Sequence, residues 1–135
     1  MAGSWSGRLG AYRPQALAAL RIMTALQFIA HGTQKFFNFP PAEKPFMDLM
    51  NLIGVAGVLE IVGGLLVLVG LFTRPAAFVL SGFMAAAYFM AHAPVDFFPV
   101  NNRGDAAISF CFIFLYLVFA GPGAYALDNR REPSV

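Results

Sequence analysis

The stretch at residues 49–72, LMNLIGVAGVLEIVGGLLVLVGLF, decides the fold class. It runs for 24 residues, and Glu60 is its one charged side chain. A helix needs about 20 apolar residues to cross a bilayer core about 30 Å thick. The stretch therefore predicts a membrane-spanning helix. Because a carboxylate at that depth is costly and usually faces a partner or a pocket, Glu60 is a candidate functional residue.

The composition of the whole chain agrees with this interpretation. The chain has 135 residues, of which 59% are hydrophobic and 12% are charged. Soluble domains are about 25% charged. So apolar a chain of one-domain length indicates an integral membrane protein. The single cysteine, Cys111, lies in an apolar run and is expected to be a buried core residue.

Three further apolar segments complete the predicted fold, which is all-α: an integral membrane four-helix bundle. The four helices are expected at about 14–37, 49–72, 75–92 and 105–120. They form one domain at 14–127, between a polar, mobile N-terminal tail at 1–13 and a polar C-terminal tail at 128–135. Asp48 is the expected N-cap of the second helix.

The distribution of basic residues predicts the orientation. Four spans place both tails and the short turn between the second and third helices on one side. That side carries Arg8, Arg13, Arg74, Arg130 and Arg131, whereas the other side carries only Lys35, Lys44 and Arg103. Because basic residues favour the cytoplasmic side, both termini are predicted to be cytoplasmic.

A weak internal repeat suggests two helical hairpins. FIAHG at 28–32 and FMAHA at 89–93 each end a helix and precede an aromatic, proline-containing loop. Such a repeat fits two hairpins related by an axis along the membrane normal. In a chain this rich in Phe and Ala, the match could also arise by chance.

Two groups of polar residues could carry chemistry. In the first, Arg21 and Glu60 lie about 24 Å and 18 Å from the side of the two long loops, at 1.5 Å per residue. We expect a structural buried ion pair, because two unpaired charges at that depth would cost several kcal/mol. The alternative is a proton-handling or ligand-orienting pair at the floor of a pocket.

The second group lies nearer the long loops and consists of His31, Lys35, His92 and Asp105. One interpretation is interfacial hydrogen bonding that anchors the loops. The other is a pocket for an amphipathic molecule with a polar head, such as a quinone, whose carbonyl groups accept hydrogen bonds from His or Lys. The predicted ligand-binding residues are then His31, Lys35, Glu60, His92 and Asp105, with an aromatic slot that Phe28, Phe36, Phe37, Phe97 and Phe98 could form.

Other chemistries find less support in the sequence. A metal shared by His31 and His92 is conceivable but is not our prediction, and no catalytic residue is assigned. The sequence contains no GxGxxG, P-loop, HExxH or GxSxG motif and no basic patch for nucleic acid. A quinone is the only cofactor that the residues suggest.

Over about residues 17–128, the chain resembles the DoxX family of small bacterial four-helix membrane proteins. The resemblance is carried by short motifs in a characteristic order: Arg21, the HGxxK of His31, Gly32 and Lys35, the ExxGG of Glu60, Gly63 and Gly64, Thr73-Arg74-Pro75, Asn102/Gly104/Asp105, Gly121-Pro122-Gly123 and Leu127-Asp128. Where the family typically has glutamate after Asn-x-Gly, this chain has Asp105.

The resemblance implies a multi-pass protein of the bacterial inner membrane that is linked to redox chemistry and contacts quinone. If it is an enzyme, it would be a subunit of a quinone-linked oxidoreductase that works with a soluble redox partner. The alternative is a non-catalytic membrane subunit or assembly factor that recruits such a partner. Small residues at Gly57, Gly64 and Ala85 to Ala87 suit close helix contacts within the chain or in a homo-oligomer. A transporter is a third, less favoured interpretation.

Overall fold

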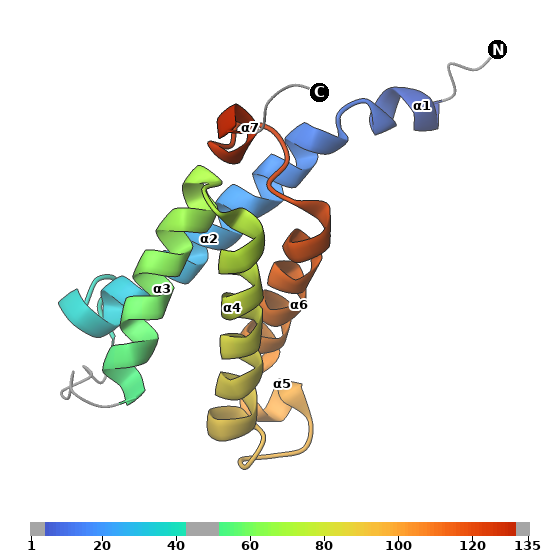
Figure 1. Ribbon diagram of the computed structural model, residues 1–135. Helices are drawn as coiled ribbons and strands as arrows, with labels where there is room; N and C mark the ends of the chain where they lie inside the picture. The colour runs from blue at the N-terminus through green and yellow to red at the C-terminus, as the bar shows by residue number, and fades with distance from the viewer. Residues whose placement is uncertain (1–4, 43–51, 132–135) are drawn as a thin grey trace.

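A computed structural model gives the structure and describes residues 5–42 and 52–131. The described residues form helices and no strands (Figure 1). In chain order the helices are α1 (Trp5–Gly10), α2 (Arg13–Phe37), α3 (Leu52–Val69), α4 (Thr73–Ala87), the π-helical η1 (Tyr88–His92), α5 (Pro99–Asn102), α6 (Asp105–Ala120) and α7 (Asp128–Arg131). The all-α prediction is thus confirmed.

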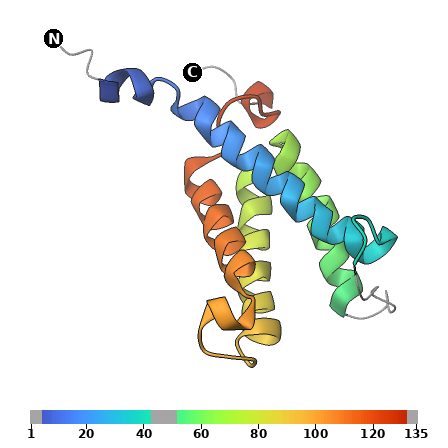
Figure 2. The same ribbon diagram turned by 180° about the vertical axis from the view of Figure 1, so that it is seen from behind.

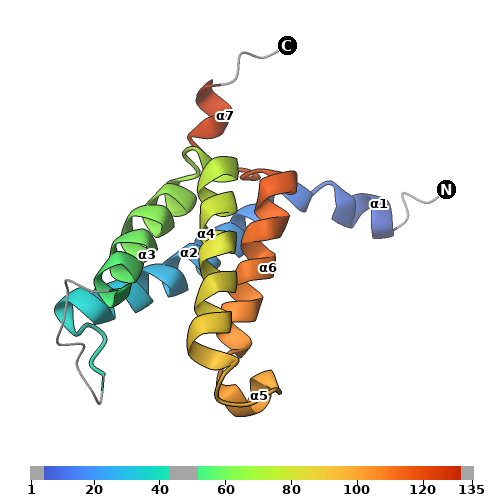
Figure 3. The ribbon, with the colours of Figure 1, turned by 60° about the horizontal axis from the view of Figure 1, so that its bottom comes forward.

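The four long helices form two antiparallel pairs. Helices α2 and α3 pack along each other and make the first arm, and α4 and α6 make the second arm. The arms meet at the end that holds α1 and α7, and they diverge toward the end that holds α5 (Figures 1 and 2). Figure 3 shows the same divergence from below. The two hairpins suggested by the repeat are present, although they do not form a closed bundle.

Glycine lets the helices of the first arm approach closely. A Cβ atom at Gly32 would lie 2.6 Å from the Ile61 side chain and 3.0 Å from the Gly57 carbonyl oxygen. A Cβ at Gly64 would lie 2.6 Å from the Ile29 side chain. Small residues permit such close packing of membrane helices. This close approach brings the end of α2 within side-chain reach of the middle of α3.

The apolar core lies mainly in the second arm. Phe28 of α2 is buried there, and its ring meets the rings of Phe110 and Phe114 edge-on, with centroids 5.4 Å and 5.0 Å apart. Many large apolar side chains remain exposed, including Val58, Val62, Phe78, Val79, Phe112 and Phe119. Aromatic contacts from Phe28 therefore join the arms, while the outer helix faces are apolar, as contact with lipid requires.

The predicted helix bounds need several adjustments. Residues 105–120 form a helix as predicted, but α4 begins at Thr73, inside the predicted turn, and its last turn is π-helical. The expected mobile tail at 1–13 instead contains α1, and the C-terminal tail begins with α7. Asp48 and residues 49–51 of the second predicted helix lie outside the described residues.

By length and hydropathy, one helix of the described residues could cross a membrane. It is the continuous segment Thr73–His92, with a mean hydropathy of 1.3. Ile53–Val69 and Asp105–Ala120 are apolar but shorter. Helix α2 is long enough at 25 residues, but polar side chains such as Arg21 and Lys35 lower its hydropathy. Four spans therefore remain a prediction.

Candidate functional site

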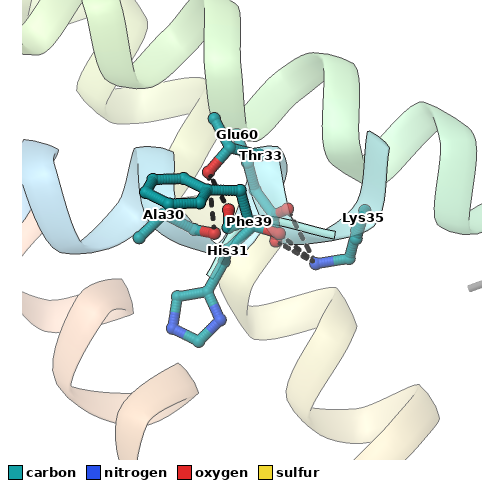
Figure 4. A network of polar contacts seen from close by, with 6 residues as sticks. All are labelled: Ala30, His31, Thr33, Lys35, Phe39 and Glu60. Atoms are coloured by element: carbon teal, nitrogen blue, oxygen red, sulfur yellow. Dashed lines mark hydrogen bonds and ion pairs between the residues drawn. The ribbon is translucent and has the colours of Figure 1, made fainter. Parts of the chain in front are cut away.

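Lys35 and Glu60 form an ion pair between the two helices of the first arm. The Lys35 ammonium group lies 2.8 Å from Oε1 and 2.7 Å from Oε2 of Glu60, so it bonds both carboxylate oxygens (Figure 4). Glu60 is 5% exposed, and Lys35 is half-buried. A buried carboxylate needs such a partner. The pair fixes the last turn of α2 against α3.

The predicted ion pair between Arg21 and Glu60 is wrong. Arg21 is fully buried and donates hydrogen bonds to the carbonyl oxygens of Pro122, of Ala124 at 3.0 Å and of Tyr125 at 3.1 Å. A Cβ at Gly70 would lie 3.4 Å from Arg21 Cζ, which places Arg21 beside the end of α3, about 15 Å along the helix from Glu60.

The prediction failed because depth along each helix does not fix how α2 and α3 are aligned. A Cβ at Gly32 would lie 3.0 Å from Glu60 Cβ, so Glu60 meets the last turns of α2, whereas Arg21 lies 11 residues, or about 16 Å, before Gly32. An antiparallel neighbour matches Glu60 with a residue near the end of α2. Lys35 holds that position.

His31 lies one helical turn before Lys35 and points another way. In Figure 4 its ring is directed away from the ion pair, toward the second arm. The ring is exposed and meets the Phe110 ring edge-on, with centroids 5.8 Å apart. Phe110 packs on Phe28 and Phe114. An imidazole thus lies beside an aromatic cluster at the junction of the arms.

His92 belongs to a different network, at the loop end of the second arm. Its Nδ1 lies 3.0 Å from the Asn102 carbonyl oxygen, and its ring stacks on Tyr88. The buried Asn102 amide donates to the Tyr88 hydroxyl at 3.1 Å and to the Asp96 carbonyl oxygen at 3.0 Å, and it accepts from the Gly104 N–H at 2.8 Å. This network ties the π-helical turn to α5.

The five predicted ligand-binding residues therefore lie in two places. His31, Lys35 and Glu60 are on the first arm, whereas His92 and Asp105 are on the second, which diverges from it (Figure 1). Asp105 is exposed and is the first residue of α6, whose N-cap residue is Gly104. His31 and His92 are not brought together, and no group of three or more His, Cys, Asp or Glu in the described part of the chain could hold a metal ion.

The aromatic slot is also divided. Phe28 lies in the core, but Phe97 and Phe98 are 85% and 59% exposed and contact each other on the loop of the second arm. Phe36 and Phe37 pack together at the end of α2. Of the predicted set, only Phe28 lies in the cluster beside His31.

Sequence reasoning missed the role of Asp128. Its two carboxylate oxygens accept the backbone N–H groups of Phe72 at 2.8 Å and Thr73 at 2.9 Å, at the start of α4. Burial opposes ionisation, but hydrogen bonds from Thr73 and Phe72 and the charge of Arg131 outweigh it and hold the pKa of Asp128 below its ordinary value. Leu127-Asp128 is a recognisable motif, but its partner lies 55 residues away.

Comparison with known proteins identifies the family. The DoxX family model matches residues 16–93, which include α2, α3 and α4 with the ion pair and His31. The chain belongs to the DoxX family. It is 49% identical to an uncharacterized protein of Haemophilus influenzae over 124 residues, covering 88% of this chain and 92% of the relative.

Two further relatives bear on the location of this DoxX protein. It is 33% identical to the uncharacterized membrane protein Rv3486 of Mycobacterium tuberculosis, with 96% of this chain and 89% of the relative covered. It is 30% identical to the inner membrane protein YphA of Escherichia coli, with 90% and 94% covered. These relatives support a bacterial inner-membrane location. No solved structure gives a significant match.

Proposed function

We propose that this DoxX protein binds the head group of a quinone-like molecule beside His31, where α2 meets the second arm. The observation that carries the proposal is the exposed His31 ring against Phe110, within a helix of a membrane protein. A polar group exposed on a membrane helix is costly unless it meets water or a polar ligand. A quinone carbonyl is an acceptor of the kind that an imidazole N–H can bond.

The aromatic surroundings suit the ring of such a ligand. Phe28, Phe110 and Phe114 already pack edge-on or stacked on one another, and Phe83 lies 6.4 Å from Phe28 between ring centroids. Ligand sites are usually apolar and aromatic, with a few polar groups that fix orientation. His31 would provide the polar contact and the phenylalanines the apolar wall.

The ion pair has a supporting part in this proposal. Lys35 lies four residues after His31, and its ammonium group is 3.5 Å from the His31 carbonyl oxygen. By joining α2 to α3, Lys35 and Glu60 hold the turn that carries His31. Lys35 and Glu60 would act as positioning residues. His92 and Asp105, which lie elsewhere on the second arm, have no part in this ligand site.

A redox role would need a partner. Reduction of a quinone takes two electrons and two protons; His31 could pass protons near neutral pH. We propose that the electrons come from a soluble redox protein, which would make the chain a subunit of a quinone-linked oxidoreductase. Under the alternative, an assembly subunit, the same partner would bind without any quinone.

The test is thermal unfolding of the detergent-purified protein with short-chain quinones and their reduced forms. We expect concentration-dependent stabilisation, because a ligand that binds only the folded state raises its unfolding temperature. His31→Ala should abolish the shift, whereas His92→Ala, the same change on the other arm, should retain it. Equal loss in both variants, or no shift with any quinone, would contradict the site and favour the assembly subunit.

A further inference from the structure

A polar cavity and an apolar groove meet at the end of the molecule that holds α1 and α7, far from His31. The cavity, of about 680 Å³, is lined by Arg74, Asn129 and Arg131 among others. The groove, of about 550 Å³, is lined by Leu17, Leu20 and Tyr116, with Arg13 at its start. Pro14, Ala120 and Gly123 line both, so the two spaces lie side by side.

The cavity offers donors for an anion. Arg74 uses Nη1 to bond the carbonyl oxygens of Val118 at 2.9 Å and Phe119 at 2.8 Å. A guanidinium has five N–H donors, and Arg74 is exposed, so donors remain for a further acceptor. Arg131 is exposed too, with its Cζ 4.4 Å from the centroid of the Phe72 ring.

Of the described residues, one acidic side chain, Asp128, lines the cavity, and both of its oxygens already accept backbone N–H groups. With Arg13 at the groove, three arginines face this one engaged carboxylate across the two spaces. The balance of charge favours an anionic ligand.

The groove extends the site along the membrane helices. Leu17 and Leu20 belong to α2 and Tyr116 belongs to α6, and Leu20 and Tyr116 are 39% and 57% exposed. An inorganic anion would use only the cavity, and an uncharged lipid only the groove. In a phospholipid, the phosphodiester matches the cavity and the attached acyl chain matches the groove beside it.

We propose that the cavity and groove together bind one anionic phospholipid. Its phosphodiester lies among Arg13, Arg74 and Arg131, and an acyl chain lies along the groove between α2 and α6. The proposal does not depend on the quinone site, which lies beyond the middle of α2. The occupant is a lipid of the membrane that the family inhabits.

The experiment is a native mass spectrometry titration of the full chain in an uncharged detergent. Phosphatidylglycerol should bind one to one and roughly tenfold or more tighter than phosphatidylcholine, since each arginine near an anionic head group contributes about 1 kcal/mol. Arg13→Gln/Arg131→Gln should weaken phosphatidylglycerol binding by roughly 30-fold. The control, Arg8→Gln/Arg130→Gln, removes the same charge at the same end but from residues that do not line the cavity or groove.

Ala16→Phe provides a second variant. Ala16 is exposed and lines the groove, so a phenyl ring there should weaken phosphatidylglycerol binding without changing any charge. Equal weakening in both arginine pairs would show a diffuse charge effect and overturn the proposal. Competition by inorganic phosphate at equal concentration would show a simple anion site and overturn it, as would equal binding of phosphatidylcholine.

Discussion

Two buried charged side chains, Glu60 and Arg21, are stabilised by different kinds of partner. Glu60 meets the ammonium group of Lys35, one charge against another, at 2.7 Å. Arg21 forms no salt bridge with a carboxylate of the described residues and instead donates to main-chain carbonyl oxygens. Both carboxylate oxygens of Asp128 accept backbone N–H groups at the start of α4. Each charge therefore fixes a different junction of the fold.

The first prediction concerns the ion pair. Glu60→Leu should destabilise the protein by about 3 kcal/mol, because it removes the carboxylate that Lys35 bonds at a partly buried position. Lys35→Met/Glu60→Leu should recover most of that loss, since an apolar pair of similar volume replaces two charges that burial penalises. Unfolding in mixed micelles measures both. A double variant that is as unstable as Glu60→Leu would contradict the idea that Lys35 deprived of this carboxylate causes the loss of stability.

At the scale of elements, the C-terminal segment after α6 closes the end where the arms meet. The Ala124 N–H donates to the Pro14 carbonyl oxygen at 2.9 Å, and the Leu127 N–H donates to Val69 at 3.0 Å. Asp128 then caps α4. The segment thus bonds α2, α3 and α4 in turn. The residues at the start of α4 do not indicate that their capping residue lies 55 positions later in the chain.

The pH dependence of this closure follows from the pKa of Asp128. Because that pKa is lower in the folded protein, the stabilisation is present above the unfolded value of about 3.9 and is lost as the pH falls through the folded value. Protection of the Phe72 and Thr73 amides from hydrogen exchange, relative to their intrinsic rates, should therefore fall below about pH 4.

Asp128→Asn should cost about 1 kcal/mol, as loss of a helix cap does, and should remove the acid dependence of exchange at these amides. Asp105→Asn is the matched control, because Asp105 is an exposed aspartate at the start of another helix, α6, and the Phe72 and Thr73 amides bond Asp128. Unchanged acid sensitivity in Asp128→Asn, or its loss in Asp105→Asn, would refute the assignment.

At the scale of the whole molecule, two arms joined at one end replace the expected closed bundle. The turn between α3 and α4 holds the arms together, and Phe28 adds the aromatic contacts of the core. Toward the α5 end, the helices separate in every view (Figures 1 to 3).

Spin labels can measure this separation in a Cys111→Ala background. A pair at the exposed residues Leu65 and Phe78 lies near the α3–α4 turn, and a pair at Val55 and Phe89 lies near the opposite ends of the same helices. We expect the second distance to be clearly longer than the first. Similar distances for the two pairs would indicate a closed, parallel-sided bundle and contradict the open arrangement.

Much of this architecture could be predicted from the sequence, and the failures have physical causes. Apolar stretches and prolines located the helices, and Gly57 and Gly64 predicted close packing, which their contacts with Phe36 and Ile29 show. Lys35 and Glu60 were both predicted to be site residues. Counting residues along each helix, however, could not decide whether Lys35 or Arg21 pairs with the Glu60 carboxylate. Arg21 bonds backbone carbonyls, which every residue carries, so no residue type could mark its partners.

The contacts of Arg21 also have a consequence for biosynthesis. Its carbonyl partner at Pro122 lies 101 residues later in the chain, so the ribosome makes α2 long before it makes the group that receives its guanidinium. Until residues 122–125 have been made, the Arg21 guanidinium lacks these acceptors. Completion of this junction is therefore coupled to the emergence of residues 122–125, and a chain that stalls before them would carry an arginine without its native hydrogen bonds.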